Sequence, residues 1–174
     1  MSTLNLGTGG AAISGSGANL TSTSAMDLTG NIVDFPAGTV IQTVTATTTT
    51  EEANSNSSYI TWFGCTWTPK QTNSHKIITV NAIRLIVGAA DMEANFRISD
   101  GSNVTPRYRI FNDNVSGNLW HNPCMSWYWT QSHTAGQSCT FSAQCRDGNG
   151  QTSNNVIWGD SGAVSTIVIQ EIAQ

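Results

Sequence analysis

The quartet Gly-Asp-Ser-Gly at residues 159–162 is the pattern in this sequence with the clearest potential for catalysis. A serine in such a quartet attacks a carbonyl carbon when a histidine accepts its proton and backbone N–H groups hold the oxyanion. Only thirteen residues follow Ser161, and Ala163 stands where a further glycine is expected. No recognisable base motif surrounds the histidines, which are His75, His121 and His133. A turn into a last strand explains the quartet equally well, so the sequence predicts no catalytic residue and no enzyme.

A second set of side chains has the donor atoms of a metal site. Zinc accepts nitrogen and sulfur ligands in a tetrahedral arrangement. The possible donors are His121, Cys124, His133, Cys139 and Cys145. The spacings between these residues match no compact zinc knuckle, and the sequence therefore predicts no metal and no cofactor.

The four cysteines have a simpler interpretation. Cys139 and Cys145 share one face of an expected strand with Phe141, and no Cys-x-x-Cys pair occurs. We expect free, buried thiols of a protein made in a reducing cytoplasm. One disulfide between neighbouring strands is the alternative.

An aromatic cluster late in the chain has a binding interpretation. Flat aromatic faces pack on sugar rings, which would make Trp127, Tyr128 and Trp129 a platform for a host glycan. We expect Trp127 and Trp129 on one strand face, and Met125 with Tyr128 on the other. Our first expectation for the cluster is sandwich core and subunit interface, with the glycan platform as the alternative. The better glycan candidates lie in an expected loop and are Trp120 and His121.

The elements that would position these side chains are strands throughout. We expect no helix, and an antiparallel β-sandwich or jelly roll over residues 35–174. Turn signals predict hairpins around residues 100–103 and 132–136. The eight expected strands are at residues 39–47, 59–66, 76–87, 92–99, 104–111, 124–131, 137–146 and 164–172.

The longest of these strands, at residues 76–87, changes face partway. Ile78 and Ala82 share one parity, whereas Ile83 and Leu85 share the other. Because side chains alternate with period two, a one-residue slip exchanges the two faces. The pattern predicts a bulge or bend near Ala82 and a strand that can serve two sheets.

Residues 1–34 have a different composition. Single apolar residues are spread through Gly, Ser, Thr and Ala, which offers too little apolar area for independent folding. We expect an extended N-terminal arm that a partner holds in place; a disordered tail is the alternative. The apolar residues proposed as assembly anchors are Leu4, Leu6, Ile13, Leu20, Met26 and Leu28.

Composition narrows the class of protein. Charged residues make up 10% of the chain, against about 25% in typical soluble domains, which favours an extracellular or virion-type protein. The net charge is -4 and no basic residue precedes Lys70. Because we find no clustered basic face in the sequence, we expect no nucleic-acid partner. Neither a membrane span nor a secretion signal is evident, so we expect no membrane insertion and release by lysis.

Three short motifs occur in a recognisable order. They are Phe-Pro-Ala-Gly-Thr-Val-Ile-Gln at 35–42, Thr-Trp-Thr-Pro at 66–69 with Ser-His-Lys-Ile-Ile at 74–78, and Ser-Thr-Ile-Val-Ile-Gln-Glu-Ile-Ala at 165–173. In this order and spacing the chain resembles the β-sandwich domains of tailed-phage virion proteins. These include tail-fibre tips and capsid surface proteins of marine and cyanobacterial phages. The resemblance covers residues 35–174.

The resemblance implies a non-enzymatic structural protein, made in the host bacterial cytoplasm and displayed on the virion surface. The short arm lacks both a long shaft and a collagen-like Gly-X-Y period, which favours a capsid decoration (cement) protein. Such proteins are commonly trimers whose arms clip neighbouring capsomers. The implied partners are therefore further copies of this chain and the major capsid protein or another virion protein. The alternative is a tail-fibre tip that recognises a host surface glycan.

Overall fold

The computed structural model describes residues 35–54, 57–82, 85–87, 92–112, 119–148, 156–159 and 162–174. In this part of the chain every regular element is a strand and every strand pairing is antiparallel. The all-β prediction is confirmed. The described residues include no helix long and apolar enough to cross a membrane.

The strands fall into two length classes, with eight of five to nine residues and four of three residues. Their bounds are β1 Val40–Thr48, β2 Glu52–Asn54, β3 Ile60–Trp67, β4 His75–Asn81, β5 Leu85–Val87, β6 Met92–Ser99, β7 Tyr108–Asn112, β8 Leu119–His121, β9 Cys124–Trp129, β10 Cys139–Asp147, β11 Val156–Trp158 and β12 Ser165–Ile172.

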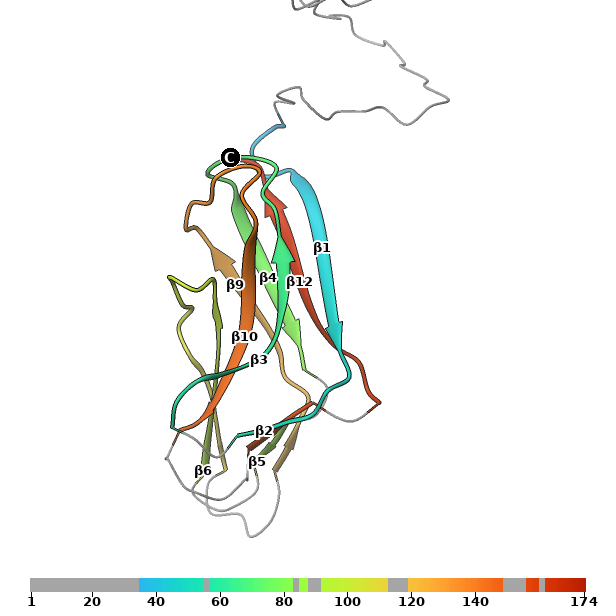
Figure 1. Cartoon of the computed structure of the whole chain (residues 1–174), viewed down its shortest axis with the longest axis vertical. Helices are drawn as coiled ribbons and strands as arrows, with labels where there is room; N and C mark the ends of the chain where they lie inside the picture. The colour runs from blue at the N-terminus through green and yellow to red at the C-terminus, as the bar shows by residue number, and fades with distance from the viewer. Residues whose placement is uncertain are drawn as a thin grey trace, which may run out of the picture. The chain divides into compact units, whose positions relative to one another are not determined.

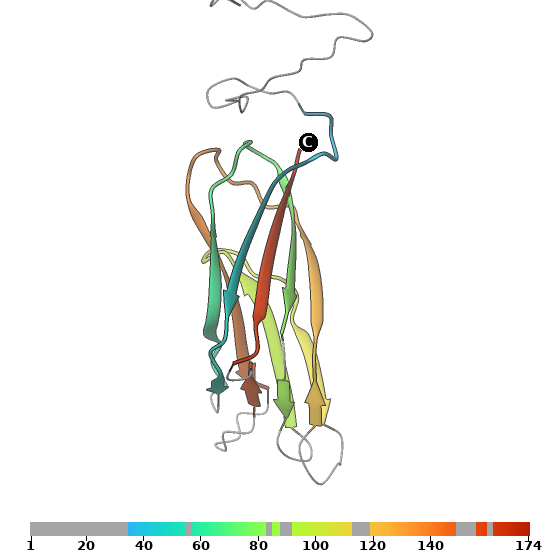
Figure 2. The same cartoon turned by 90° about the vertical axis from the view of Figure 1, so that its right-hand side faces the viewer.

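Eight of these strands have five residues or more and form two four-stranded sheets. Sheet A has the order β1-β12-β4-β9, and sheet C has the order β3-β10-β6-β7. Counted among the long strands alone, these orders are 1-8-3-6 and 2-7-4-5, the double Greek key of a jelly roll. The two sheets face each other in Figure 1, and Figure 2 shows sheet A with β12 between β1 and β4. The predicted eight-stranded sandwich is confirmed.

Four three-residue strands form a third sheet that the sequence did not predict. Sheet B has the order β2-β11-β5-β8, and each of its strands lies in a connection between two long strands. These four connections meet at the lower end of the sandwich in Figure 1. Three residues are too few for a periodic pattern, so β2 and β8 were expected as loops.

The core lies between sheets A and C and follows strand alternation. Phe141, Ala143 and Cys145 of β10 point inward, as do Ile78 and Val80 of β4, and all five are fully buried. Aromatic rings fill the space between the sheets: Trp67, Phe96, Trp129, Phe141 and Trp158 are buried. The apolar area removed from water in this layer is the main stabilising contribution of the fold.

The predicted bend in the long strand is confirmed. β4 ends at Asn81 in sheet A, and β5 begins at Leu85 in sheet B. Ala82 and Leu85 are both fully buried although they have opposite parity. The chain therefore changes face between the two strands and passes from one sheet to another.

One of the two predicted hairpins is wrong. β6 and β7 pair directly around a turn in which Asp100 N donates to Asn103 O (3.2 Å) and Gly101 has a φ of 95°. By contrast, β9 belongs to sheet A and β10 to sheet C, so residues 132–136 connect the two sheets. Turn chemistry indicates where a chain reverses, but it does not decide which strands pair.

Candidate binding surfaces

Several residues singled out from the sequence lie outside the described residues. These include the six anchor candidates of residues 1–34, together with Asp160 and Ser161. The glycan candidates Trp120 and His121 lie in β8 and not in a loop, which corrects that expectation. His121 is exposed.

The candidate metal ligands do not come together. His121 lies in sheet B, whereas His133 lies in the connection between β9 and β10. Among the described residues, no three His, Cys, Asp or Glu side chains form a group that could hold a metal ion.

The cysteines are unpaired in the structure, and one of them departs from the buried environment that was expected. Cys65 and Cys145 are buried, Cys139 is half-buried and Cys124 is exposed. Burial raises the pKa of the thiols of Cys65, Cys139 and Cys145. Because the thiolate is the nucleophile, these three thiols are poorly suited to covalent catalysis.

The aromatic cluster is mostly core. Trp129 is buried, and Trp127 stacks on Phe96 with 5.9 Å between ring centroids. Met125 is buried on the same face as these two rings, so its predicted position beside Tyr128 is wrong. Alternation with period two places residues 125, 127 and 129 together. Tyr128 is the most exposed member, with 60% of its surface exposed, whereas Trp127 is half-buried.

A shallow groove lies beside Tyr128. It has a volume of about 210 Å³ and is lined by β9 and by the connection between β6 and β7: Asn103, Val104, Thr105, Pro106, Trp127, Tyr128, Trp129, Thr130 and Gln131. Pockets for drug-sized ligands usually span about 300–1,000 Å³. The groove therefore suits one sugar ring better than a large cofactor.

The outer face of sheet A is uncharged. Thr43, Thr45 and Thr47 of β1 are exposed, and Thr79 of β4 bonds to Ser126 of β9 with 2.8 Å between their hydroxyl oxygens. At one end of this face, His75 Nδ1 hydrogen-bonds the hydroxyl of Tyr128, and the two rings pack edge to face. The described residues place no Asp, Glu, Lys or Arg side chain on this face. Its other outward-facing members are Ile77, Asn81, Cys124, Thr166, Val168 and Gln170.

The outer face of sheet C carries four of the seven basic residues of the chain. Arg109 lies opposite Asn95 of β6, and Asn95 lies opposite Arg146 of β10. Arg97 follows two positions along β6, and Arg107 precedes Arg109 by two positions. Side chains two residues apart point to the same face, so the four guanidinium groups share one side of the sheet.

Each of these arginines contacts either the carboxylate of Glu93 or the ring of Tyr59. Arg109 Nη2 lies 2.8 Å from Glu93 Oε2, and Arg107 Nη1 lies 3.9 Å from Glu93 Oε1. The guanidinium carbon of Arg97 lies 3.7 Å from the centre of the Tyr59 ring, and that of Arg146 lies 4.9 Å from it. The sequence showed no clustered basic face. The pairing of β7, β6 and β10 brings the four arginines together on one side of the sheet.

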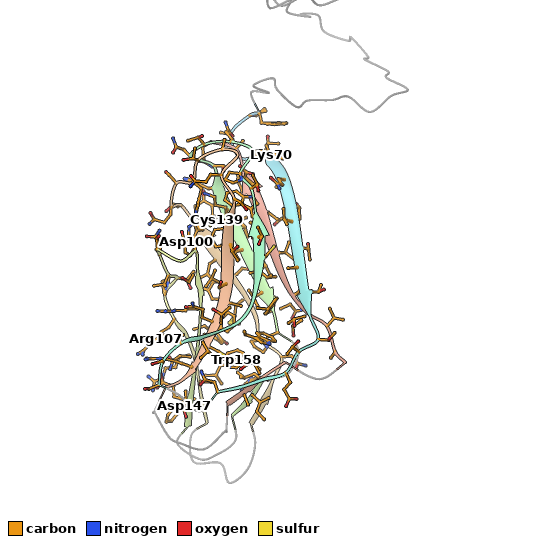
Figure 3. The ribbon with its side chains drawn as sticks, viewed as in Figure 1. Lys70, Asp100, Arg107, Cys139, Asp147 and Trp158 are labelled. Atoms are coloured by element: carbon orange, nitrogen blue, oxygen red, sulfur yellow. The ribbon has the colours of Figure 1, made fainter. Side chains whose placement is uncertain are left out.

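A buried charge network closes the end of the sandwich opposite sheet B. The carboxylate of Glu171 is fully buried and accepts bonds from Lys70 N and Gln71 N (3.0 Å each) and from Ser74 Oγ (2.7 Å). These donors satisfy most of its hydrogen-bonding capacity. The backbone between β3 and β4 is thereby fixed to β12. Lys70 marks this end in Figure 3.

Lys76 and His133 extend this network. Lys76 Nζ donates to Gln131 O (2.8 Å) and lies 5.1 Å from the centre of the Trp67 ring. Burial lowers the pKa of Lys76 to about 8, against the opposing effect of Glu171. Burial, assisted by the charge of Lys76, lowers the pKa of His133, whose Nε2 lies 3.3 Å from Asp100 Oδ2.

The network joins three connections between strands, and each of its polar groups contacts another part of the chain. The arrangement is that of a structural clamp. Comparison with known proteins adds no assignment, because the sequence matches no protein-family model and no curated protein.

Proposed function

We propose that this protein is a non-enzymatic structural protein of a phage virion. In this proposal it is a capsid decoration protein that forms a trimer and is fixed to the shell through residues 1–34. The observation that carries the proposal is the uncharged outer face of sheet A. This face spans four strands and presents hydroxyl, amide and β-branched side chains.

Such a face suits association between copies of the chain. The centres of protein interfaces are depleted in charged residues, because each charge that is buried without a partner must be desolvated at high cost. Hydroxyl groups such as those of Thr79 and Ser126 can bond to each other, as they do within this sheet. Burial of this face therefore leaves no unpaired charge.

The motifs that carry the resemblance to phage proteins meet at one place in the fold. The first and third motifs pair as β1 and β12, where Gly38 N donates to Ala173 O and Ala173 N donates to Thr39 O (2.9 Å each). The second motif contributes Ser74, which donates to Glu171 of the third. The three motifs therefore come together where β1 pairs with β12, close in sequence to Phe35, the first described residue.

Deletion of residues 1–34 tests the role of the arm. The truncated chain is expected to keep its β-type circular dichroism and to lose binding to capsids of the phage that encodes it. The full-length protein on the same capsids is the control. Unchanged occupancy by a folded truncated chain would contradict the proposal.

A second candidate function is a tail-fibre tip that recognises a host surface glycan, and the groove beside Tyr128 favours it. The exposed ring of Tyr128 can pack on a sugar, and the adjoining groove of about 210 Å³ has room for one sugar ring. The glycan candidates Trp120 and His121 lie on β8 and are not among the residues that line this groove. If the groove binds the glycan, Tyr128→Ala abolishes adsorption to host cells while the oligomer persists. If β8 binds it instead, Trp120→Ala or His121→Ala has that effect. A glycan array without signal for the wild-type chain would contradict this candidate.

A further inference from the structure

The outer face of sheet C has more hydrogen-bond donors than the protein uses. Each guanidinium group carries five N–H donors. Arg107 has 53% of its side chain exposed, and its ion-pair contact with Glu93 is 3.9 Å long. Arg109 is 51% exposed and directs one nitrogen to Glu93 at 2.8 Å. Figure 3 shows Arg107 at the margin of the molecule.

The other two arginines are oriented by tyrosine. Arg97 Nε donates to Gln144 Oε1 (2.8 Å), and Arg146 Nη1 donates to Ser57 O (3.3 Å). Both groups lie over the ring of Tyr59. An arginine that is stacked on an aromatic ring loses less freedom when it binds an anion.

We propose that this face is a binding site for an acidic polysaccharide whose charges are carboxylates. The guanidinium groups of Arg107, Arg109 and Arg146 bind the carboxylates, and the exposed ring of Phe111 packs on a neighbouring sugar. This site is separate from the groove beside Tyr128, and it does not depend on either function proposed above.

Carboxylate chemistry follows from the geometry on this face. A planar carboxylate matches the fork of a guanidinium group, with two parallel N–H···O bonds. Glu93 shows that this face accepts a carboxylate: one of its oxygens lies 2.8 Å from Arg109 Nη2 and the other lies 3.9 Å from Arg107 Nη1. The ring of Phe111 is 40% exposed and lies 5.3 Å from the guanidinium carbon of Arg109. An apolar surface therefore adjoins the charged one, as a sugar acid requires.

A sugar polymer fits this face better than a nucleic acid does. At physiological ionic strength, exposed charges more than about 8 Å apart are largely screened, so a bound polyanion responds mainly to the four arginines and to Glu93. A single-stranded nucleic acid also stacks successive bases on several aromatic rings. Phe111 is the exposed ring that lies against one of these arginines, which is enough for one sugar but not for a row of bases.

Binding of the full-length protein to immobilised polygalacturonate tests the proposal. Neutral dextran and single-stranded DNA serve as comparison surfaces. We expect binding to polygalacturonate that weakens as salt is raised, with little binding to dextran or DNA. The double variant Arg107→Gln/Arg146→Gln is expected to weaken binding by about tenfold, because hydrogen bonds to charged groups are lost.

Lys70→Gln is the matched control, because it removes a positive charge from an exposed side chain at the clamp end of the sandwich. It is expected to change the affinity by less than about twofold. Thermal unfolding of each variant establishes that it is folded. Three results would overturn the proposal: no binding by the wild-type chain, equal losses in the double variant and in Lys70→Gln, or tighter binding to DNA than to polygalacturonate.

Discussion

The two outer faces of this jelly roll are built in the same way and differ in chemistry. On sheet A the outward positions carry hydroxyl, amide and β-branched side chains without charge. On sheet C they carry four arginines and the carboxylate of Glu93. The chain is poor in charged residues, and the fold places most of its arginines on one side.

This difference separates two kinds of binding. An uncharged face can be buried against another copy of the chain without desolvating an ion. A face with stacked guanidinium groups keeps its charges in water and attracts an anion. The comparison therefore predicts that substitutions on one face leave the behaviour of the other unchanged.

The largest effect is expected from a charge on the uncharged face. Thr79→Asp should dissociate the proposed trimer, because a buried charge without a partner costs about 3–5 kcal/mol. Sedimentation velocity measures the change in mass. Thr140→Asp places the same charge on the outer face of sheet C and should leave the trimer intact. Equal dissociation by both variants would remove the distinction between the faces.

A substitution in the buried charge network around Glu171 should lower the stability of the whole sandwich, and with it both outer faces. Glu171→Gln removes a buried carboxylate that accepts bonds from Lys70 N, Gln71 N and Ser74 Oγ. The free energy of unfolding should fall by about 3 kcal/mol, as measured by chemical denaturation. Lys70→Gln provides the control, since it changes an exposed side chain and keeps the backbone N–H that bonds to Glu171; it should cost less than about 0.5 kcal/mol. A stable Glu171→Gln variant would mean that the clamp is dispensable.

The buried lysine of the clamp makes stability depend on pH. Burial lowers the pKa of Lys76 from an ordinary value of 10.5 to about 8. Between these values the unfolded chain binds more protons at this position, so the free energy of unfolding contributed by Lys76 rises with pH. Relative to Lys76→Met, the wild-type protein should gain about 2–3 kcal/mol between pH 8 and pH 10.5. Parallel pH profiles for the two proteins would show that the lysine is not buried as described.

The smallest effect is expected on the arginine face itself. Arg109→Gln leaves the buried carboxylate of Glu93 with only the 3.9 Å contact to Arg107, and should cost about 1 kcal/mol. Arg107→Gln should cost less than about 0.5 kcal/mol. Adding Glu93→Gln to Arg109→Gln should recover most of the loss, as thermal unfolding would show. A larger loss of stability in Arg107→Gln than in Arg109→Gln would show that Arg107, and not Arg109, makes the stronger contact with Glu93.

Strand patterns predicted the framework of this fold well. The long strands alternate strictly, as in β10 and β12, and the change of parity at Ala82 located the passage from β4 to β5. Sequence pattern did not predict the short strands or the pairing partners of β9 and β10. Three-residue strands such as β8 carry no period, and the turn at residues 132–136 gave no information on which sheet follows.

The arginine face was missed for a different reason. Arg97 and Arg146 are far apart in the sequence, and only the pairing of β6 with β10 brings them together. Their parity was visible, but the register of the strands was not. A charged surface on a β-sandwich depends on register, so composition and charge runs alone could not reveal it.

The mass of the full-length chain in solution tests the central claim most directly. One chain has a mass of 18.5 kDa. Native mass spectrometry or sedimentation equilibrium should find three times this mass for the wild-type protein. It should find the mass of one chain for Thr79→Asp. A wild-type protein that stays monomeric at every concentration would contradict the assignment of the uncharged face to self-association.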